Sequence, residues 1–279
     1  MKRITFEKLL VTIILILSLL FGIGVFNIHL NEVEYTKVSN SVIEGDKVII
    51  EEKKKEPIID FEFAWTNKEW QDNYEINNDY VGDLRFESGL IDLPVVQGYD
   101  NEIYLASDWV TGEYLEQGTA FVDYEVIYKD SDIQQEDLNI TIYGHYCYPS
   151  IDPEQKLAFT PLKNLVSEDV YKENKYIQLL LGDEIRRYEI AEVFYCDLIS
   201  DESGKYVYTR DDMQYYLTSF TKEYLEEYKR QIAERRFYET GVSYDESSHL
   251  LTLQTCVADH DELRLIIIAK EIERIKLEK

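Results

Sequence analysis

The chain has 279 residues, 45% of them hydrophobic, which is enough for a packed core in one domain or two small ones. Its 55 acidic and 29 basic side chains give a net charge of −26, which argues against nucleic-acid binding because phosphate contacts require clustered lysine and arginine. The three cysteines are too few and too scattered for a disulfide framework or a zinc site, so we expect no metal and no cofactor.

The first segment of the chain predicts a membrane anchor. Residues 9–26 carry no charge over 18 positions, the minimum for a spanning helix, and Lys2, Arg3 and Lys8 precede them. A cleaved signal peptide is the alternative, but no small-x-small cleavage site follows the apolar run. Because basic residues stay on the cytoplasmic side, we expect a cytoplasmic tail at 1–8 and the rest of the chain outside the cell membrane.

The composition then changes twice before the first strand. Residues 27–57 are charged and end in a proline, which predicts a solvated extracellular stalk, and 58–279 form the folded domain. Aromatic and apolar residues from Trp65 to Tyr80 follow mixed helical spacing and predict one or two short N-terminal helices.

The rest of the domain reads mainly as β-strands. Apolar or alternating runs bounded by turn residues predict strands at 90–98, 118–126, 138–146, 249–256 and 264–275, and a hairpin over 175–199 that turns at Gly182-Asp183. In the run 138–146, alternation places Ile140, Ile142 and Gly144 on one side and Thr141, Tyr143 and His145 on the other.

One segment interrupts the β pattern. Residues 211–238 contain no glycine or proline and have apolar residues at helical spacing, which predicts one long amphipathic helix ended by Gly241. Many short strands and one inserted helix indicate a β-barrel or sandwich with helical additions.

The last two predicted strands hold the first candidates for chemistry. Cys256 ends one strand and Arg264 begins the next, so antiparallel pairing would bring them together at one rim of the sheet. A thiolate nucleophile needs a proton partner and donors for the oxyanion, and an arginine can supply the donors but cannot be a base. The alternatives are a buried structural cysteine and an arginine that pairs with the acids of the intervening loop.

Two histidines compete for the role of proton partner. His145 lies at the end of a predicted strand beside a tight turn, and His260 lies in the loop between Cys256 and Arg264. We favour His145, although a histidine at a strand end is more often structural than catalytic.

These pieces together resemble the sortase family, over roughly residues 70 to 275. "TLQTC" with an arginine eight residues after its cysteine is similar to the sortase signature, and "IYGHY" is similar to the sortase histidine motif. "IDLPVVQGYDNEIYL", "GTAFVDYE" and the helix before "SSHLLTLQTC" resemble class B sortases.

The resemblance implies a mainly β fold, an eight-stranded sortase-type β-barrel with N-terminal helices and a long helix inserted before the cysteine strand. It implies a cysteine transpeptidase of Gram-positive cells that cleaves a C-terminal sorting signal of secreted surface proteins and joins them to a peptidoglycan amine through a thioacyl intermediate. By position, Cys256 matches the nucleophile, His145 the general acid and base, and Arg264 the oxyanion or substrate arginine. The substrate groove is matched by four further residues, Thr255, Tyr143, Asn101 and Leu105.

Some positions depart from the family pattern. Tyr146 stands where asparagine is frequent, Gln254 where serine is frequent, and Val257 where an acid is frequent, which leaves substrate preference open. Cys147 is also unusual and suggests a disulfide with Cys256 that inactivates the enzyme, with a spare thiol as the alternative.

Three other functions stay open from the sequence. A pilin-polymerising sortase would use a lysine amine, and a non-catalytic wall-binding scaffold would use the same barrel without the thiol. In a papain-like protease the nucleophile precedes the histidine, whereas here His145 precedes Cys256.

Overall fold

The computed structural model describes residues 67–276 except 128–136, 183, 201–205 and 209–213, together with 42–44 and 47–49. The chain divides into two units, residues 1–62 and 63–279. In the first unit, β1 (Val42–Glu44) and β2 (Lys47–Ile49) pair as an antiparallel hairpin within the expected stalk.

The expected anchor at 9–26 lies outside the described residues. Among the residues that are described, no helix is long and apolar enough to cross a membrane.

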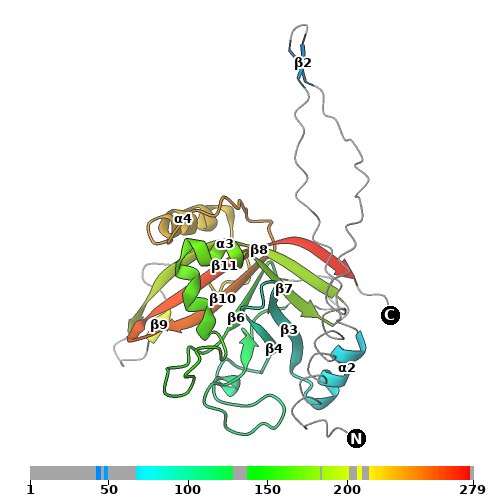
Figure 1. The fold of residues 1–279 in the computed structure, drawn as a ribbon, viewed down its shortest axis with the longest axis vertical. Helices are drawn as coiled ribbons and strands as arrows, with labels where there is room; N and C mark the ends of the chain where they lie inside the picture. Colours follow the sequence, from blue (N-terminus) through cyan, green and yellow to red (C-terminus); the bar gives the residue numbers. More distant parts are fainter. Residues whose placement is uncertain are drawn as a thin grey trace, which may run out of the picture. The chain divides into compact units, whose positions relative to one another are not determined.

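The second unit contains a closed β-barrel (Figure 1). Its eight strands are β3 (Tyr80–Phe86), β4 (Asp92–Val96), β5 (Ala120–Val122), β6 (Asn139–Tyr143), β7 (Tyr176–Leu181), β8 (Glu184–Ser200), β10 (Leu250–Val257) and β11 (His260–Lys276). The strands neighbour one another in the order β11-β10-β6-β5-β4-β3-β7-β8, and β8 pairs back onto β11. Closure removes the exposed edges that an open sheet would leave for aggregation. A short strand, β9 (Tyr206–Tyr208), pairs with the end of β8.

The predicted strands and the sortase-type barrel are confirmed, but the N-terminal helical prediction extends too far. The helix α2 (Asn67–Ile76) ends before Asn77, whose side chain accepts a hydrogen bond from Asp79 N at 2.8 Å and donates one to Trp109 O at 2.8 Å. Tyr80, which the spacing assigns to a helix, instead begins β3 with its side chain 1% exposed. A side-chain turn at Asn77 therefore separates helix from strand.

The long helix predicted over 211–238 is also wrong in length. The structure has a 12-residue helix, α4 (Lys222–Ala233), which begins where Thr221 Oγ1 accepts a hydrogen bond from Tyr224 N. Before it, the carbonyls of Tyr215 and Leu217 accept from Asn139 Nδ2 at 3.0 and 2.8 Å. Carbonyls that a longer helix would need are bonded to β6 instead. Gly241 has a positive φ of 80° but lies well past the end of the helix.

The other helical elements within the described ranges are short. They are η1 (Ile103–Leu105), η2 (Thr160–Val166) and α3 (Glu168–Glu173).

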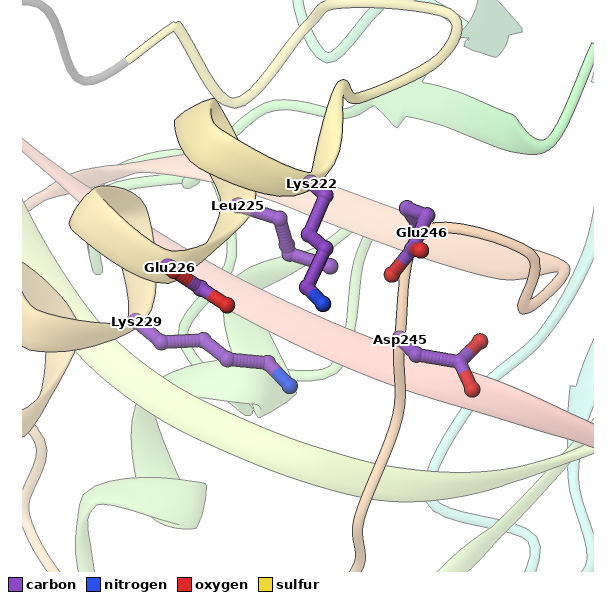
Figure 2. Close-up of a pocket in the computed structure, with 6 residues that line it drawn as sticks. All are labelled: Lys222, Leu225, Glu226, Lys229, Asp245 and Glu246. Carbon is purple, nitrogen blue, oxygen red and sulfur yellow. The ribbon is translucent and has the colours of Figure 1, made fainter.

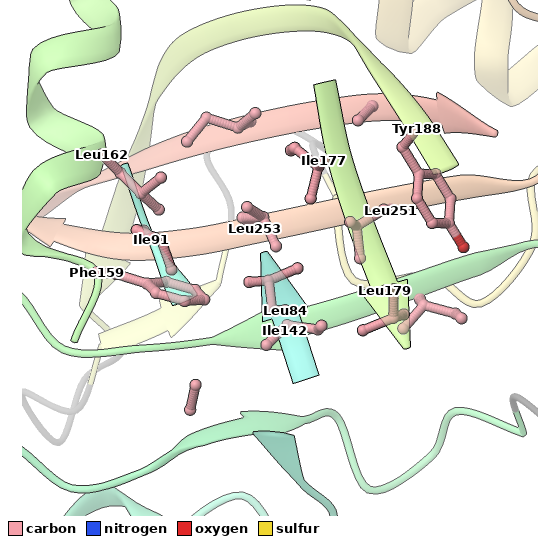
Figure 3. Packing of buried hydrophobic residues seen from close by; sticks show 14 of the residues in the cluster. Leu84, Ile91, Ile142, Phe159, Leu162, Ile177, Leu179, Tyr188, Leu251 and Leu253 are labelled. Atoms are coloured by element: carbon pink, nitrogen blue, oxygen red, sulfur yellow. The ribbon is translucent and has the colours of Figure 1, made fainter. Parts of the chain in front are cut away.

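The barrel buries its core on the inside of the strands (Figure 3). Ile140 and Ile142 of β6 and Leu251 and Leu253 of β10 are at most 2% exposed and pack against Phe159 and other interior residues. Alternate residues of the same strands face outward, where they form a second cluster with α4. The strand alternation predicted for β6 is confirmed, and it decides which side chains can reach the candidate site.

Candidate active site

The three candidate residues lie at the same end of adjacent strands. In β6 and β10, which are parallel, Tyr143 pairs with Gln254, and the contact continues where Gly144 N donates to Gln254 O at 3.1 Å. His145 and Cys256 are the next outward-facing positions beyond that pair. On the other side of β10, Cys256 pairs directly with Arg264 of the antiparallel strand β11. The structure therefore places His145, two residues past the end of β6, in line with the paired residues Cys256 of β10 and Arg264 of β11.

The row faces outward from the barrel. Residues directly paired across strands share a face, and neighbours two apart along a strand do too. Cys256 therefore shares its face with Gln254, and Arg264 shares its face with Ile266, which belongs to the outer cluster. A register irregularity follows Cys256, so the strand bends just after the thiol. Cys256 is half-buried, which suits a nucleophile that a peptide must reach.

His145 is held by a backbone carbonyl. Its Nε2 lies 2.6 Å from Leu105 O at the end of η1. Because a carbonyl oxygen only accepts, this contact requires a proton on Nε2, which leaves Nδ1 as the nitrogen that exchanges a proton in the neutral ring. The Leu105 carbonyl is itself fixed, because the chain passes at Gly118 where an added Cβ would lie 2.5 Å from Leu105 O. Gly118 also has a φ of +57°, which favours glycine.

Arg264 lies between two thiols. Its Nη1 donates to Leu263 O at 2.8 Å, and beyond it Cys196 of β8 continues the same row. Burial raises the pKa of Cys196 to about 11, although the nearby charges of Arg235 and Arg264 act to lower it. No pattern along the chain indicates that Cys196 belongs to this row. Full burial makes it a poor nucleophile beside the accessible Cys256.

Two other candidates from the sequence, Cys147 and His260, do not belong to the row. Cys147 is a free thiol, 1% exposed, and burial raises its pKa, so nothing in the structure supports the disulfide with Cys256. His260 is exposed at the start of β11, where it pairs with Val257, and its Nδ1 lies 3.4 Å from Glu262 Oε1. His145, held beside the thiol strand, is thus better placed than His260.

The four residues expected to line the substrate groove differ in their exposure and in their hydrogen bonds. Leu105 is 41% exposed beside His145 and is free to contact a peptide. Thr255 faces the barrel interior and is fully buried, so its side chain does not line the site surface. Tyr143 Oη donates to Asp123 Oδ2 at 2.6 Å, and Asn101 Nδ2 donates to the same oxygen at 3.0 Å. Asp123 is not among the residues expected from the sequence, where it is an ordinary acid inside the strand predicted at 118–126.

A separate hollow lies beside α4 (Figure 2). Its volume is about 370 Å³, and its walls combine two lysines, one leucine and three acids, namely Lys222, Leu225, Glu226, Lys229, Asp245 and Glu246. None of the candidate catalytic residues lines it. Within the described ranges, His, Cys, Asp and Glu side chains form no group of three that suits a metal ion.

No protein-family model matches the chain, but similar proteins are found among curated sequences and solved structures. The chain is similar to Sortase B of Staphylococcus aureus, 23% identical over 203 residues that cover 71% of this chain and 72% of the relative. It is also similar to Sortase B of Listeria monocytogenes, 25% identical over 210 residues that cover 74% and 75%. The crystal structure of Clostridium perfringens Sortase B aligns with a TM-score of 0.57 and 28% identity, over 73% of this chain and 99% of that one.

The closed barrel and these relatives together define a sortase, a cysteine transpeptidase. Within that family, the chain is similar to class B.

Proposed function

We propose that this sortase cleaves a C-terminal sorting signal of secreted surface proteins and joins the product to an amine of the cell-wall peptidoglycan. The observation that carries the proposal is the row of His145, just past the end of β6, with Cys256 and Arg264 on the outer face of β10 and β11. A half-buried thiol on the outer side of the barrel, beside the exposed Leu105, suits an extended peptide. Sortase B of S. aureus has been solved as a substrate complex, and a Sortase B has been solved with triglycine; each is 19% identical to this chain. These complexes support a peptide and an amine as the two substrates.

The first half of the reaction forms an acyl enzyme. The Cys256 thiolate attacks the carbonyl carbon of a threonine-like residue, and Arg264 donates hydrogen bonds to the oxyanion. The peptide C–N bond then breaks, and His145 as imidazolium gives its proton to the departing amine. A thioester on Cys256 remains.

The second half transfers the acyl group. The incoming amine loses a proton to His145 and attacks the thioester carbon, a new amide bond forms, and the Cys256 thiolate leaves. One amide bond is broken and one is made, so the exchange requires no external energy source. Water in place of the amine gives slow hydrolysis.

The proposal also includes the cellular location of the enzyme and its orientation in the membrane. The uncharged residues 9–26 and the basic residues before them support a single-pass anchor with a cytoplasmic N-terminus and an extracellular catalytic domain. Protease treatment of intact cells should remove the catalytic domain from membranes that retain the N-terminus. Recovery of the chain in the soluble cytoplasmic fraction would refute the placement.

The chemistry is tested with the full chain and fluorogenic peptides that each place a threonine before the scissile bond. Mass spectrometry should find an adduct of the peptide's acyl part on Cys256, and triglycine should divert product from acid to amide. Cys256→Ala should form no adduct, whereas Cys147→Ala should behave as wild type. Cleavage by Cys256→Ala would disprove the assignment, and a lysine ε-amine acceptor used in preference to triglycine would favour a pilin-polymerising enzyme.

A further inference from the structure

Asp123 connects the two segments that hold His145. It follows β5, is 4% exposed, and its Oδ2 accepts hydrogen bonds from Tyr143 Oη at 2.6 Å and from Asn101 Nδ2 at 3.0 Å. Tyr143 lies two residues before His145 at the end of β6, and Asn101 lies four residues before Leu105. One carboxylate oxygen thus joins the strand that carries the imidazole to the loop that carries its carbonyl partner.

The carboxylate is itself fixed in position. Asp123 Oδ1 accepts from Glu125 N at 2.9 Å, Asp123 N donates to Thr141 O at 2.9 Å, and Asp123 O accepts from Gln97 Nε2 at 2.9 Å. Hydrogen bonds to a carboxylate are shorter and stronger than those between neutral groups. A buried group held at both ends has one geometry, so it transmits position from one segment to the other.

The side-chain amide of Asn101 is engaged at both ends. Its Oδ1 accepts from Tyr124 N at 3.0 Å while its Nδ2 donates to Asp123. Both polar atoms thus have partners within the protein. This arrangement suits a brace for the loop better than a contact with a passing peptide.

We infer that Asp123 is a positioning residue that, through Tyr143 and Asn101, sets the contact between His145 and the Leu105 carbonyl. The inference rests on the proposed role of His145 as acid and base. Asp123 touches neither the substrate nor the thiol. It determines where the imidazole lies at the moment of proton transfer, so its loss lowers turnover and leaves peptide binding nearly unchanged.

The test compares Asp123→Asn, Tyr143→Phe and the double variant in the full chain. The assay is transpeptidation of a fluorogenic threonine peptide to triglycine, with kcat divided by the fraction of enzyme that a thiol reagent titrates at Cys256. Asp123→Asn should lower kcat about 10- to 100-fold because a misplacement of about 1 Å costs that much, while KM stays within twofold. The double variant should be no slower than Asp123→Asn, because both changes remove the same connection.

The matched controls are Glu125→Gln and Tyr124→Phe. These two side chains are neighbours of Asp123 on the exposed surface, where Tyr124 Oη donates to Glu125 Oε1 at 3.1 Å. Both should keep wild-type kcat. If Asp123→Asn does not fold, Tyr143→Phe alone carries the test, because removal of one hydroxyl retains the ring and its packing against Phe121.

Three outcomes would overturn the inference. One is a kcat for Asp123→Asn and Tyr143→Phe within twofold of wild type. The second is a rise in KM at constant kcat, which would make Tyr143 and Asn101 peptide contacts. The third is multiplicative losses in the double variant. Failure of the proposed function would differ, because His145→Ala would then turn over as fast as wild type.

Discussion

Gly144 is the position where one added methyl group should do most damage to the site. A Cβ built there would lie 2.5, 2.6 and 2.8 Å from three ring carbons of Phe159, where ordinary carbon contacts are about 3.5 to 4.0 Å. Phe159 is fully buried in the barrel interior (Figure 3), and its backbone N donates to His145 O at 2.9 Å. The ring and the chain before His145 therefore cannot separate without moving the imidazole.

The expected loss of stability and activity follows from the overlap between the added Cβ and the ring of Phe159. Gly144→Ala must shift either Phe159 or His145 by about 1 Å, which costs about 1 to 3 kcal/mol of stability as an overpacked core. That should lower Tm by about 3 to 9 °C. The same shift at His145 should lower kcat about 100-fold with little change in KM.

The assay measures Tm by circular dichroism and kcat by transpeptidation to triglycine. Gly89→Ala is the control, because Gly89 has open space around a new Cβ but a φ of +79°, so it loses about 1 to 2 kcal/mol through backbone strain alone. Gly89→Ala should lose stability and retain kcat. The reasoning would be refuted by a Gly144→Ala enzyme with wild-type Tm and kcat, since the ring would then move aside freely.

Three further predictions concern charge and access. Arg264→Lys should lower kcat about 100-fold with little loss of stability, because a lysine lacks the planar fork that can hold an oxyanion. A thiol reagent at pH 8 should modify Cys256 rapidly in the native protein and reach Cys147 and Cys196 only after unfolding, because the latter two are at most 1% exposed. Burial raises the pKa of Glu192 to about 6, above its ordinary value of 4.5, so its folded form favours the proton and stability should fall as the pH rises from about 4.5 to 6.

Each of these has an outcome that would contradict it. A wild-type rate for Arg264→Lys would show that the guanidinium of Arg264 takes no part in the reaction. Labelling of Cys147 or Cys196 as fast as Cys256 in the native state would show that these two thiols are not buried. Glu192→Gln should abolish the loss of stability, at most about 2 kcal/mol, between pH 4.5 and 7, and an unchanged pH profile in that variant would assign the effect elsewhere.

Most strands of the barrel, and the pairing of Cys256 with Arg264, could be predicted from the sequence by itself. Strand periodicity located β4 to β8, β10 and β11, and a cysteine and an arginine on consecutive strands predicted their pairing at one rim. These features depend on local spacing and on the antiparallel connection of neighbouring strands, and both are visible along the chain.

Only the tertiary structure decided which segments far apart in the sequence form hydrogen bonds with one another. The apolar spacing of 214–221 reads as helix, yet Asn139 of β6 binds its carbonyls and delays the helix until Thr221. Asp123 is likewise an ordinary acid in the sequence, and only the fold places Tyr143 and Asn101 against it. Hydrogen bonds between segments far apart leave no period in a sequence, so the connection between Asp123 and His145 appears only once the barrel closes.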